Sequence, residues 1–563
     1  MNQIADKATT EERPVMMASL LTKDDKPSGI KVKFNFPRGD GRFGDMITKI
    51  KSLPDRRFNS DDPYDKYWRI GLSLEAGEKL KEWGFEFSSG LQKWLDDLIK
   101  PFDEKAFNLT ELDPRLFPFQ RTGVAFIESR KGRALVADEQ GLGKTCEAIS
   151  WLRLHPELRP VIVVCPASIK MNWSIEFSMW GLDNEKIQII SGKKNGCVLT
   201  GSIIIINYDI LTAWLEALIS YNAKALILDE VHYCKGSNTL RTKSTKRLAK
   251  KVSHVIALSG TPIVNRPMEF FNPINMIRPD IFPSFWRFAQ KFCGARYNGF
   301  GWDFTGATNT EELHKLLTET IMLRRLKRDV LKDLPDKIYS IVPFEITNRK
   351  EYEKASMDII SWIAENIGKE EADRASQAET LVEFEKLKQL AVQGKMEAVR
   401  EWIENFLESG EKLVLFATHI STLDFLQSSF PDISVRLDGS TSQKDRQTAV
   451  DRFQTDDKIC LFLGNTQAAG IGITLHASSN VAHIELPWTP GAWSQATDRL
   501  HRIGQKNTVN VWTLVAQDTV EEDIAVLLSN KAKVLSEVLD GKPVDEGTLL
   551  TDLIKKIRER LKK

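Results

Sequence analysis

Short β-rich apolar runs that alternate with longer helical patterns extend from about residue 113 to the second half of the chain. This alternation is typical of βαβ units, which place consecutive strands in a parallel sheet. A first series of predicted strands covers 133–138, 161–166, 202–208, 225–230 and 254–261, and a second covers 412–418, 434–439, 460–467, 481–487 and 509–516. We therefore predict an α/β protein with two doubly wound parallel sheets. One large α/β domain is the alternative.

Length and composition narrow the classes of protein to consider. The 563 residues suffice for several domains. Lys and Arg (78) balance Asp and Glu (77), so a nucleic acid would have to meet a local basic track. The six cysteines include no Cys-x-x-Cys pair, which favours free thiols. No apolar run reaches the roughly 20 residues of a spanning helix. We expect a soluble, unsecreted protein without a membrane partner, cytoplasmic in a prokaryote or virus and nuclear in a eukaryote.

A glycine-rich turn follows the first predicted strand. Residues 137–145 read Ala-Asp-Glu-Gln-Gly-Leu-Gly-Lys-Thr and precede a helical pattern. Backbone N–H groups of such a turn can converge on a phosphate at a helix N-terminus. Gly141 and Gly143 would form the turn, Lys144 would reach the β- and γ-phosphates, and Thr145 would ligate Mg²⁺. Asp138 stands where the general phosphate-loop pattern has its first glycine.

Two adjacent carboxylates end the fourth strand of the first series. Asp229 is placed to hold Mg²⁺, directly or through water. Glu230 could then act as the general base that polarises the attacking water. Acidic residues after a strand also serve as helix N-caps. Their position 85 residues after Lys144 (229 − 144), within one βαβ series, favours the catalytic interpretation.

Two further blocks lie where they could couple the sheets. Ser259-Gly-Thr-Pro ends a strand, and the hydroxyls of Ser259 and Thr261 could sense the γ-phosphate. In the second sheet series, residues 495–505 place Arg499 and Arg502 three apart, on one face of a helix. An arginine brought across a cleft would neutralise charge on a transferred phosphoryl group. Gln495 would share the coupling role, whereas a solvated basic face is the structural alternative.

These blocks resemble motifs I, II, III and VI of superfamily-two helicases, and their variant forms resemble the Swi/Snf family. In that family the phosphate loop reads Asp-Glu-x-Gly-Leu-Gly-Lys-Thr, and motif VI contains the Arg-Ile-Gly-Gln found at 502–505. The resemblance spans about residues 112–538. It implies two RecA-like lobes that bind ATP and Mg²⁺. The implied nucleotide-binding residues are Gln120, Asp138, Glu139, Gln140, Gly141, Leu142, Gly143, Lys144, Thr145 and Gly472, with Gln120 on the adenine.

Other blocks imply the polymer on which such a motor acts. The segments 165–173, 207–208, 416–418 and 466–475 resemble motifs Ia, Ib, IV and V, which contact mainly DNA phosphates. They point to Pro166, Ser168, Asn207, Thr418 and Thr466. The block 322–337 resembles a Swi/Snf block absent from DEAD-box RNA helicases, and 270–292 fits the family's helical protrusion. Together they imply double-stranded DNA rather than RNA.

Aromatic and basic residues alternate in the segment before the motor. Residues 51–54, 56–59 and 66–70 read Lys-Ser-Leu-Pro, Arg-Arg-Phe-Asn and Lys-Tyr-Trp-Arg-Ile. Their spacing is similar to the HARP module of the HepA-related annealing helicases, which implies DNA contacts by Arg56, Arg57 and Trp68 at forks or junctions. A small domain with a solvated basic rim is the alternative.

The expected organisation has seven parts: 1–29, a disordered or loosely ordered tail; 30–109, a small α+β HARP-like module; 110–265, the first RecA-like lobe; 266–345, a helical protrusion and linker; 346–410, a helical insertion; 411–520, the second lobe; 521–563, a helical brace and basic tail. The expected function is ATP-dependent translocation on double-stranded DNA that rewinds forked or branched substrates. The expected partner is a single-strand-binding protein or a replication or repair protein. The alternatives are a strand-separating helicase, a chromatin remodeller and a non-catalytic DNA-binding scaffold.

Overall fold

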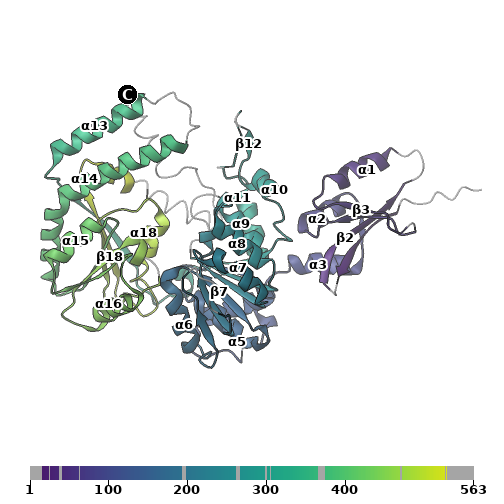
Figure 1. Cartoon of the computed structure of the whole chain (residues 1–563), viewed down its shortest axis with the longest axis horizontal. Helices are drawn as coiled ribbons and strands as arrows, with labels where there is room; N and C mark the ends of the chain where they lie inside the picture. Colours follow the sequence, from purple (N-terminus) through teal and green to yellow (C-terminus); the bar gives the residue numbers. More distant parts are fainter. Residues whose placement is uncertain are drawn as a thin grey trace, which may run out of the picture. The chain divides into compact units, whose positions relative to one another are not determined.

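The computed structural model describes residues 15–23, 26–36, 41–62, 64–108, 110–192, 198–260, 267–297, 299, 301–304, 306–365, 374–469, 472–525 and 528. Within these ranges the side chains of 358–365, 374–381, 383, 443 and 490 are not described. The chain divides into two compact units (Figure 1). One contains Met1–Phe102 with Ile274–Phe285, and the other contains the rest of the chain. Each unit is described by itself.

The smaller unit is an α+β module built on a mixed five-stranded sheet. Its strands are β1 (Val15–Lys23), β2 (Lys26–Asn35), β3 (Arg57–Asn59), β4 (Tyr67–Ile70) and β5 (Glu86–Phe87), in the order β3-β4-β2-β1-β5. Its helices are α1 (Arg42–Lys51), α2 (Leu74–Glu82) and α3 (Ser89–Leu98). Ala18, Ile30, Val32, Ile50 and Leu80 are fully buried and form its core.

The start of this module differs from the expected tail over residues 1–29. Strand β1 begins at Val15 and pairs antiparallel with β2 from Val15↔Asn35 to Lys23↔Lys26. The sequence pattern missed this strand because Val15 and Met17 are exposed, so its apolar residues mark no buried face. Pairing along the whole length of β2 decides the structure there. Residues 1–14 lie outside the described part of the chain.

The first lobe of the larger unit is a seven-stranded parallel sheet with the order β14-β6-β11-β10-β7-β9-β8. Its strands are β6 (Arg133–Val136), β7 (Val161–Cys165), β8 (Ile187–Ile189), β9 (Ile203–Asn207), β10 (Ala225–Asp229), β11 (His254–Leu258) and β14 (Met322–Leu323). Its helices are α4 (Pro118–Ser129), α5 (Lys144–Leu154), α6 (Lys170–Met179), α7 (Leu211–Ser220) and α8 (Leu240–Ala249), with the short helices η1 (Glu104–Ala106), η2 (Pro156–Leu158), η3 (Ala167–Ile169) and η4 (Val231–Cys234).

The region expected as a helical protrusion and linker contains strands as well as helices. The helices are α9 (Pro267–Ile277), α10 (Phe285–Phe292), α11 (Thr310–Thr320) and α12 (Lys327–Val330), and the strands β12 (Arg296–Tyr297) and β13 (Trp302–Asp303) form a hairpin. Strand β14 then returns to the first lobe and pairs with β6. The Swi/Snf-like block at 322–337 therefore begins as a strand of the first lobe's sheet and ends at Lys337, the first residue of a strand in the second lobe.

The second lobe is a six-stranded parallel sheet with the order β15-β20-β19-β16-β18-β17. Its strands are β15 (Lys337–Phe344), β16 (Leu413–Ala417), β17 (Ser434–Leu437), β18 (Leu461–Asn465), β19 (Asn480–His483) and β20 (Val509–Ala516). Its helices are α13 (Arg349–Glu365), α14 (Arg374–Leu407), α15 (Ile420–Ser429), α16 (Gln443–Thr455), α17 (Thr466–Ala469) and α18 (Pro490–Thr497). The lobe thus starts with β15 at Lys337, earlier than the expected boundary at 411.

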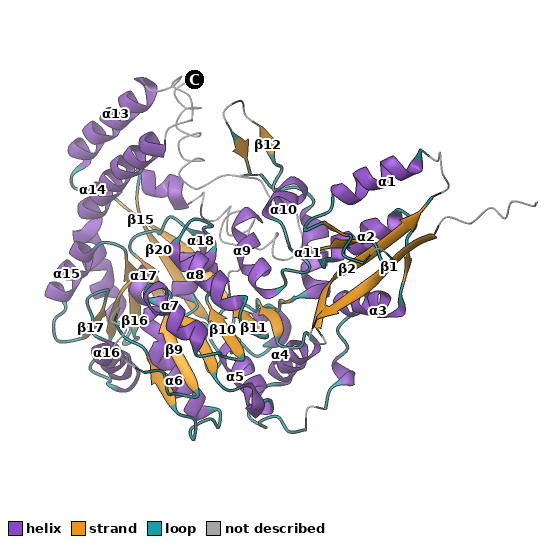
Figure 2. Ribbon diagram, turned by 45° about the vertical axis from the view of Figure 1, so that its right-hand side comes forward, coloured by secondary structure: helices purple, strands orange, loops and turns teal. Residues whose placement is uncertain are grey.

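The predicted two-sheet α/β architecture is confirmed, and all ten predicted strands are present. Figure 2 shows helices packed around both sheets. The central strands β7, β9, β10 and β16 are buried along their whole length, as expected for a parallel sheet covered on both faces. Ligands of such sheets bind beyond the carboxyl ends of the strands, which is where the predicted motif residues lie. None of the helices that the structure describes is long and apolar enough to cross a membrane.

The cysteines that the structure describes are unpaired, which agrees with the free thiols predicted from the sequence. Cys146, Cys165, Cys234, Cys293 and Cys460 are all free thiols. Burial raises the pKa of Cys146 and Cys165 well above the ordinary thiol value, so both stay protonated and inert. Cys197 lies outside the described residues.

Candidate nucleotide-binding site

The glycine turn has the backbone geometry of a phosphate loop. Gly141 and Gly143 adopt φ values of +88° and +90°, which residues with a Cβ rarely tolerate, and helix α5 begins directly afterwards at Lys144. The Lys144 ammonium donates hydrogen bonds to the backbone carbonyls of Asp138 (2.8 Å) and Glu139 (3.2 Å). Burial lowers its pKa, because desolvation disfavours the charge. The helix N-terminus and this ammonium form a site suited to an anion.

The acidic pair faces the same loop from the end of β10. Asp229 accepts a hydrogen bond from Trp173 Nε1 (2.8 Å), and burial together with the charge of Glu230 raises the pKa of Asp229 to about 7. Glu230 is held at a left-handed φ of 50°. Burial favours its neutral form, but nearby His232 and the charge of Lys144 outweigh that and lower its pKa to about 2. Glu230 is therefore an ionised carboxylate, and a cation bound beside the pair would ionise Asp229 as well.

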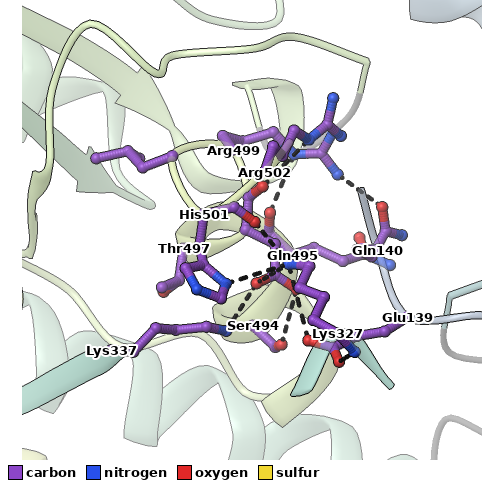
Figure 3. A network of polar contacts seen from close by, with 12 residues as sticks. Glu139, Gln140, Lys327, Lys337, Ser494, Gln495, Thr497, Arg499, His501 and Arg502 are labelled. Carbon is purple, nitrogen blue, oxygen red and sulfur yellow. Dashed lines mark hydrogen bonds and ion pairs between the residues drawn. The ribbon is translucent and has the colours of Figure 1, made fainter. Parts of the chain in front are cut away.

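The side-chain amide of Gln140 links the acidic pair to the second lobe. Gln140 Nε2 donates to Glu230 Oε1 (2.9 Å), and Gln140 Oε1 accepts from Arg499 Nη2 of the second lobe (3.1 Å). Figure 3 shows Gln140 and Arg499 pointing toward one another. Gly260 packs on the same side chain, since a Cβ there would lie 2.6 Å from Gln140 Cγ. Residues of motifs II, III and VI therefore meet at the side chain of Gln140, which belongs to motif I. Burial, then the charge of Arg502, lowers the pKa of Arg499 to about 9, so Arg499 stays protonated at neutral pH.

Arg502 meets the first lobe at a different point from Arg499. Its Cγ lies over Gly141, where a Cβ would be 2.9 Å away. Its guanidinium donates to Thr474 Oγ1 (3.1 Å) and to the backbone carbonyl of Asp498 (3.1 Å). The structure therefore places Arg499 beside the acidic pair and Arg502 beside the glycine turn.

The departure at Asp138 from the general phosphate-loop pattern has a structural partner. Arg325, which follows β14, donates to both oxygens of Asp138 (Nε distances 3.1 and 3.0 Å) and to Glu147 Oε1 (2.7 Å). Both carboxylates are fully buried. The charges of Glu147 and Asp138 overcome the effect of burial and raise the pKa of Arg325. Asp138 therefore anchors the loop to the Swi/Snf-like block.

The same block also contacts motif VI in the second lobe. Lys327 Nζ and Lys337 Nζ donate to Asp498 Oδ1 at 2.9 and 2.7 Å, and Lys327 Nζ also donates to the backbone carbonyl of His501 (2.6 Å) (Figure 3). Although burial opposes ionisation, the two ammonium groups lower the pKa of Asp498. Burial lowers the pKa of Lys327 to about 8. This buried cluster fixes the turns after helix α18 that carry Arg499 and Arg502. The prediction that these arginines share a helix face is wrong, because α18 ends at Thr497 and the chain leaves the helix at Asp498, the C-cap residue held by the two lysines.

Motif V lies against the first lobe. Gly472 adopts φ +77°, and a Cβ there would lie only 2.0 Å from Ile169 Cγ2. Its carbonyl accepts a hydrogen bond from Asn172 Nδ2 (2.5 Å). The structure thus gives Gly472 a role in the contact between the lobes. Its contact with nucleotide stays a prediction.

The other predicted nucleotide-site residues border the loop. Gln120 donates to the carbonyl of Leu142 (3.0 Å) and accepts from the N–H of Phe117 (3.0 Å), so it braces the loop. Glu139 accepts from the N–H of Lys327 (2.8 Å). Ser259 Oγ lies 3.2 Å from His232 Nδ1, which links motif III to motif II. Thr145 is the second residue of α5, and Gln495 lies in α18. Thr261 lies outside the described residues.

The predicted DNA contacts fall into two groups. In the larger unit, Pro166 directly follows strand β7 and Asn207 is the last residue of strand β9. Ser168 lies in η3. Thr466 opens α17 and donates to the carbonyl of Ala417 (3.2 Å). These residues lie near the carboxyl ends of their strands, and their contacts with DNA stay predictions.

The remaining predicted DNA contacts are Thr418 in the larger unit and Arg56, Arg57 and Trp68 in the smaller unit. The Thr418 N–H donates to Glu485 Oε2 (3.1 Å), and its buried hydroxyl makes no hydrogen bond. In the module, Arg56 and Arg57 are exposed at β3 and the half-buried Trp68 ring lies 5.2 Å from that of Phe58. This exposed edge is compatible with the predicted phosphate contacts.

Five residues of the site lie in or beside the predicted motifs but received no role from the sequence: Trp173, His232, Arg325, Lys327 and Asp498. Trp173, His232, Arg325 and Lys327 contact predicted residues through their side chains or backbone, and Asp498 holds Lys327 and Lys337. The available signal was the basic cluster at 324–327 inside the Swi/Snf-like block, where charged residues adjoin an apolar strand. Such a cluster needs buried acidic partners, which Asp138, Glu147 and Asp498 provide.

The fold and the site define a two-lobed core of the superfamily-two helicase type, with a phosphate loop and an acidic pair on one lobe and arginines on the other. The SNF2-related domain family matches residues 119–394, and the helicase conserved C-terminal domain family matches 394–504. The chain belongs to the SNF2-related (SWI/SNF) family.

Curated relatives agree with this assignment. A Caenorhabditis elegans homologue of SWI/SNF-related matrix-associated actin-dependent regulator of chromatin subfamily A-like protein 1 is 35% identical, covering 88% of this chain and 73% of the relative. The Xenopus laevis protein of that name is 36% identical over 79% of this chain and 46% of its own length. Human "DNA annealing helicase and endonuclease ZRANB3" is 35% identical over 80% of this chain and 43% of its own length. The chain thus spans about half the length of the latter two.

The central position of Gln140 leads to a test by substitution. We expect Gln140→Leu to lower ATP turnover about tenfold or more, because hydrogen bonds to charged groups contribute about 1.5–3 kcal/mol. The KM for ATP should change little, since the amide holds protein groups. A double-mutant cycle of Gln140→Leu with Arg499→Ala, read in kcat, should be strongly non-additive. Additive effects would contradict a joint role.

The stability of the second lobe should depend on pH through His419. His419 Nδ1 lies 2.6 Å from the buried Glu485 Oε2, and this hydrogen bond raises the pKa of His419 above 6.5. Because the folded-state pKa is raised, the stabilisation is complete below about pH 6.5 and is lost as pH rises through the folded pKa. Urea unfolding should therefore show a free energy of unfolding that declines as the pH rises above about 6.5. That decline should flatten in His419→Gln, and an unchanged profile would contradict the assignment.

Proposed function

We propose that this protein is an ATP-dependent translocase on double-stranded DNA that rewinds or remodels forked and branched substrates. The observation that carries the proposal is the link Glu230–Gln140–Arg499, because the hydrolytic site is complete only when groups of both lobes meet. A site divided between two lobes converts nucleotide turnover into relative movement of the lobes. This arrangement suits a motor better than a static scaffold.

The residues present fit Mg²⁺–ATP. The positive-φ glycines and the buried ammonium of Lys144 provide the phosphate cradle, and Thr145 and Asp229 provide the oxygen ligands that Mg²⁺ prefers. Bound Mg²⁺ would neutralise charge on the phosphates. Glu230, ionised and oriented by Gln140, would accept the proton of the attacking water. Arg499 and Arg502 would stabilise charge that develops on the phosphoryl group.

The rewinding activity is supported by two features. A relative at 35% identity has the name DNA annealing helicase, and the chain carries a separate α+β module with exposed Arg56 and Arg57. Basic side chains bind DNA phosphates, and aromatic side chains stack on unpaired bases. Forks and junctions present both phosphates and unpaired bases. A single-strand-binding or replication and repair protein is the proposed partner, in the compartment that holds the genome.

The decisive experiment compares ATPase rates on duplex, single-stranded and forked DNA of matched base composition. We expect duplex or forked DNA to give the largest stimulation, and Lys144→Ala to abolish turnover. Absence of turnover with every DNA, or an unchanged rate in Lys144→Ala, would favour a non-catalytic scaffold. Stimulation by RNA alone would favour an RNA helicase.

The direction of remodelling needs a second assay. A forked substrate with complementary arms should be rewound in the presence of ATP, whereas net strand displacement would favour a strand-separating helicase. Arg56→Ala with Arg57→Ala should reduce the preference for forks over plain duplex. The duplex-stimulated rate should stay unchanged, because neither residue belongs to the unit that carries the nucleotide site.

A further inference from the structure

An aromatic surface on the first lobe has no part in the nucleotide site. The β12–β13 hairpin extends beyond helix α10 (Figures 1 and 2). Tyr297 and Trp302 on its strands have 61% and 48% of their surfaces exposed, and Trp286 on α10 has 38% exposed. Trp286 and Trp302 are the exposed tryptophans among those that the structure describes. Large exposed aromatic clusters of this kind usually mark a binding site.

The three rings form one cluster. The Trp286 and Trp302 centroids lie 4.5 Å apart in an edge-to-face arrangement, and the Tyr297 ring lies 5.8 Å from that of Trp302. Mutual packing holds the rings in place without burying them. On the other side of α10, Phe288 and Phe292 are buried and anchor the helix. The cluster is therefore a rigid platform rather than a set of independent side chains.

The composition of the segment indicates the chemistry of its ligand. Residues 286–304 contain seven aromatic residues and no Leu, Ile, Val or Met. They also contain three basic residues and one acidic residue, a net charge of +2 (3 − 1). Surfaces that dock a hydrophobic peptide offer aliphatic side chains as well. Two of the three cations form exposed ion pairs, Lys291 with Glu312 (2.5 Å) and Arg296 with Asp303 (3.3 Å), which phosphates can replace at little cost. Exposed aromatic rings with such cations beside them, and without large aliphatic neighbours, are typical of surfaces on which nucleobases stack.

We propose that Trp286, Tyr297 and Trp302 form a stacking site for unpaired bases of single-stranded DNA. The inference rests on the proposed DNA substrate and adds to it a named contact for the unpaired strand at a fork. The cross-strand pair Arg296–Asp303 (Nη2 to Oδ2, 3.3 Å) fixes the register of the hairpin. Arg296, with 79% of its side chain exposed, can also reach a phosphate.

The test measures binding without nucleotide, so that its outcome is independent of ATP turnover. A fluorescent oligothymidylate and an abasic oligonucleotide of the same length carry the same phosphates, and only the former carries bases. Trp302→Ala in the full-length chain should weaken oligothymidylate binding about fivefold or more, because each stacked base contributes about 1–3 kcal/mol. Binding of the abasic strand should stay unchanged, and Trp302→Phe should restore most of the affinity.

Controls separate stacking from loss of structure. Leu240→Ala removes an exposed apolar side chain on the same lobe (69% exposed) and should alter neither affinity. Equal loss of affinity for both strands in Trp302→Ala would overturn the proposal, because phosphate binding or folding would then be responsible. Unchanged affinity for both strands in Trp302→Ala and Tyr297→Ala would overturn it as well. Failure of the translocase proposal would appear separately, as absent DNA-stimulated ATPase.

Discussion

Glu230→Gln should lower DNA-stimulated ATP turnover by about 10²- to 10⁴-fold, the usual contribution of a general base. The amide keeps the size of the carboxylate but cannot accept the proton of the attacking water. The hydrogen bond from Gln140 (2.9 Å) can be kept by the new amide oxygen, so the loop should retain its structure. The measurement is the ATPase rate at saturating DNA, together with the affinity for a fluorescent ATP analogue, which should change less than threefold by this argument.

A matched control uses a carboxylate of the same lobe outside the site. Glu216 on α7 has 75% of its side chain exposed and pairs with Arg247. Glu216→Gln should leave both the rate and the affinity unchanged. If Glu230→Gln kept more than a tenth of the wild-type rate, Glu230 would not be the general base.

Arg325→Leu should destabilise the protein by about 3–5 kcal/mol, because it leaves two buried carboxylates without their cation. Asp138 and Glu147 are fully buried, and Arg325 contacts both. The loss should appear as a lower midpoint in urea unfolding followed by tryptophan fluorescence. Nucleotide binding should weaken with it, since Asp138 belongs to the phosphate loop.

The control for this prediction is an exposed ion pair. Arg247→Leu removes the partner of Glu216 at the surface and should cost at most about 1 kcal/mol. Replacing the whole buried cluster, with Asp138→Asn, Glu147→Gln and Arg325→Met together, should recover part of the lost stability, because no unpaired charge remains. A loss below about 1 kcal/mol in Arg325→Leu would show that the carboxylates can be neutral or solvated.

Much of the site could be predicted because its chemistry is local in sequence. The turn at Gly141 and Gly143, the lysine after it and the paired acids after β10 each need only a few consecutive residues and a strand or helix beside them. The structure places all of these where the sequence indicated. The same holds for the strands, since runs such as Val161–Cys165 and Ile203–Asn207 are apolar at every or nearly every position.

Other features of the fold could not be predicted, for identifiable reasons. Strand β1 has exposed apolar residues and a buried Ala18, so its sequence pattern did not indicate a buried face of the strand. Strand β15 is largely exposed and, among the strands that the structure describes, pairs with β20 alone, and β14 has two residues. Edge strands of this kind are specified by the partner strand, and a partner is not visible in local periodicity.

The sequence by itself determined the class of the fold and indicated the groups proposed to react, because βαβ periodicity and the phosphate-loop chemistry are short-range properties. The tertiary structure alone decided how those groups are held. Asp138 meets Arg325 across 187 residues, Lys327 meets Asp498 across 171, and Gln140 meets Arg499 across 359. These contacts depend on strand order, above all on the return of β14 to β6. Since strand order is a non-local property, no local pattern in the chain records it.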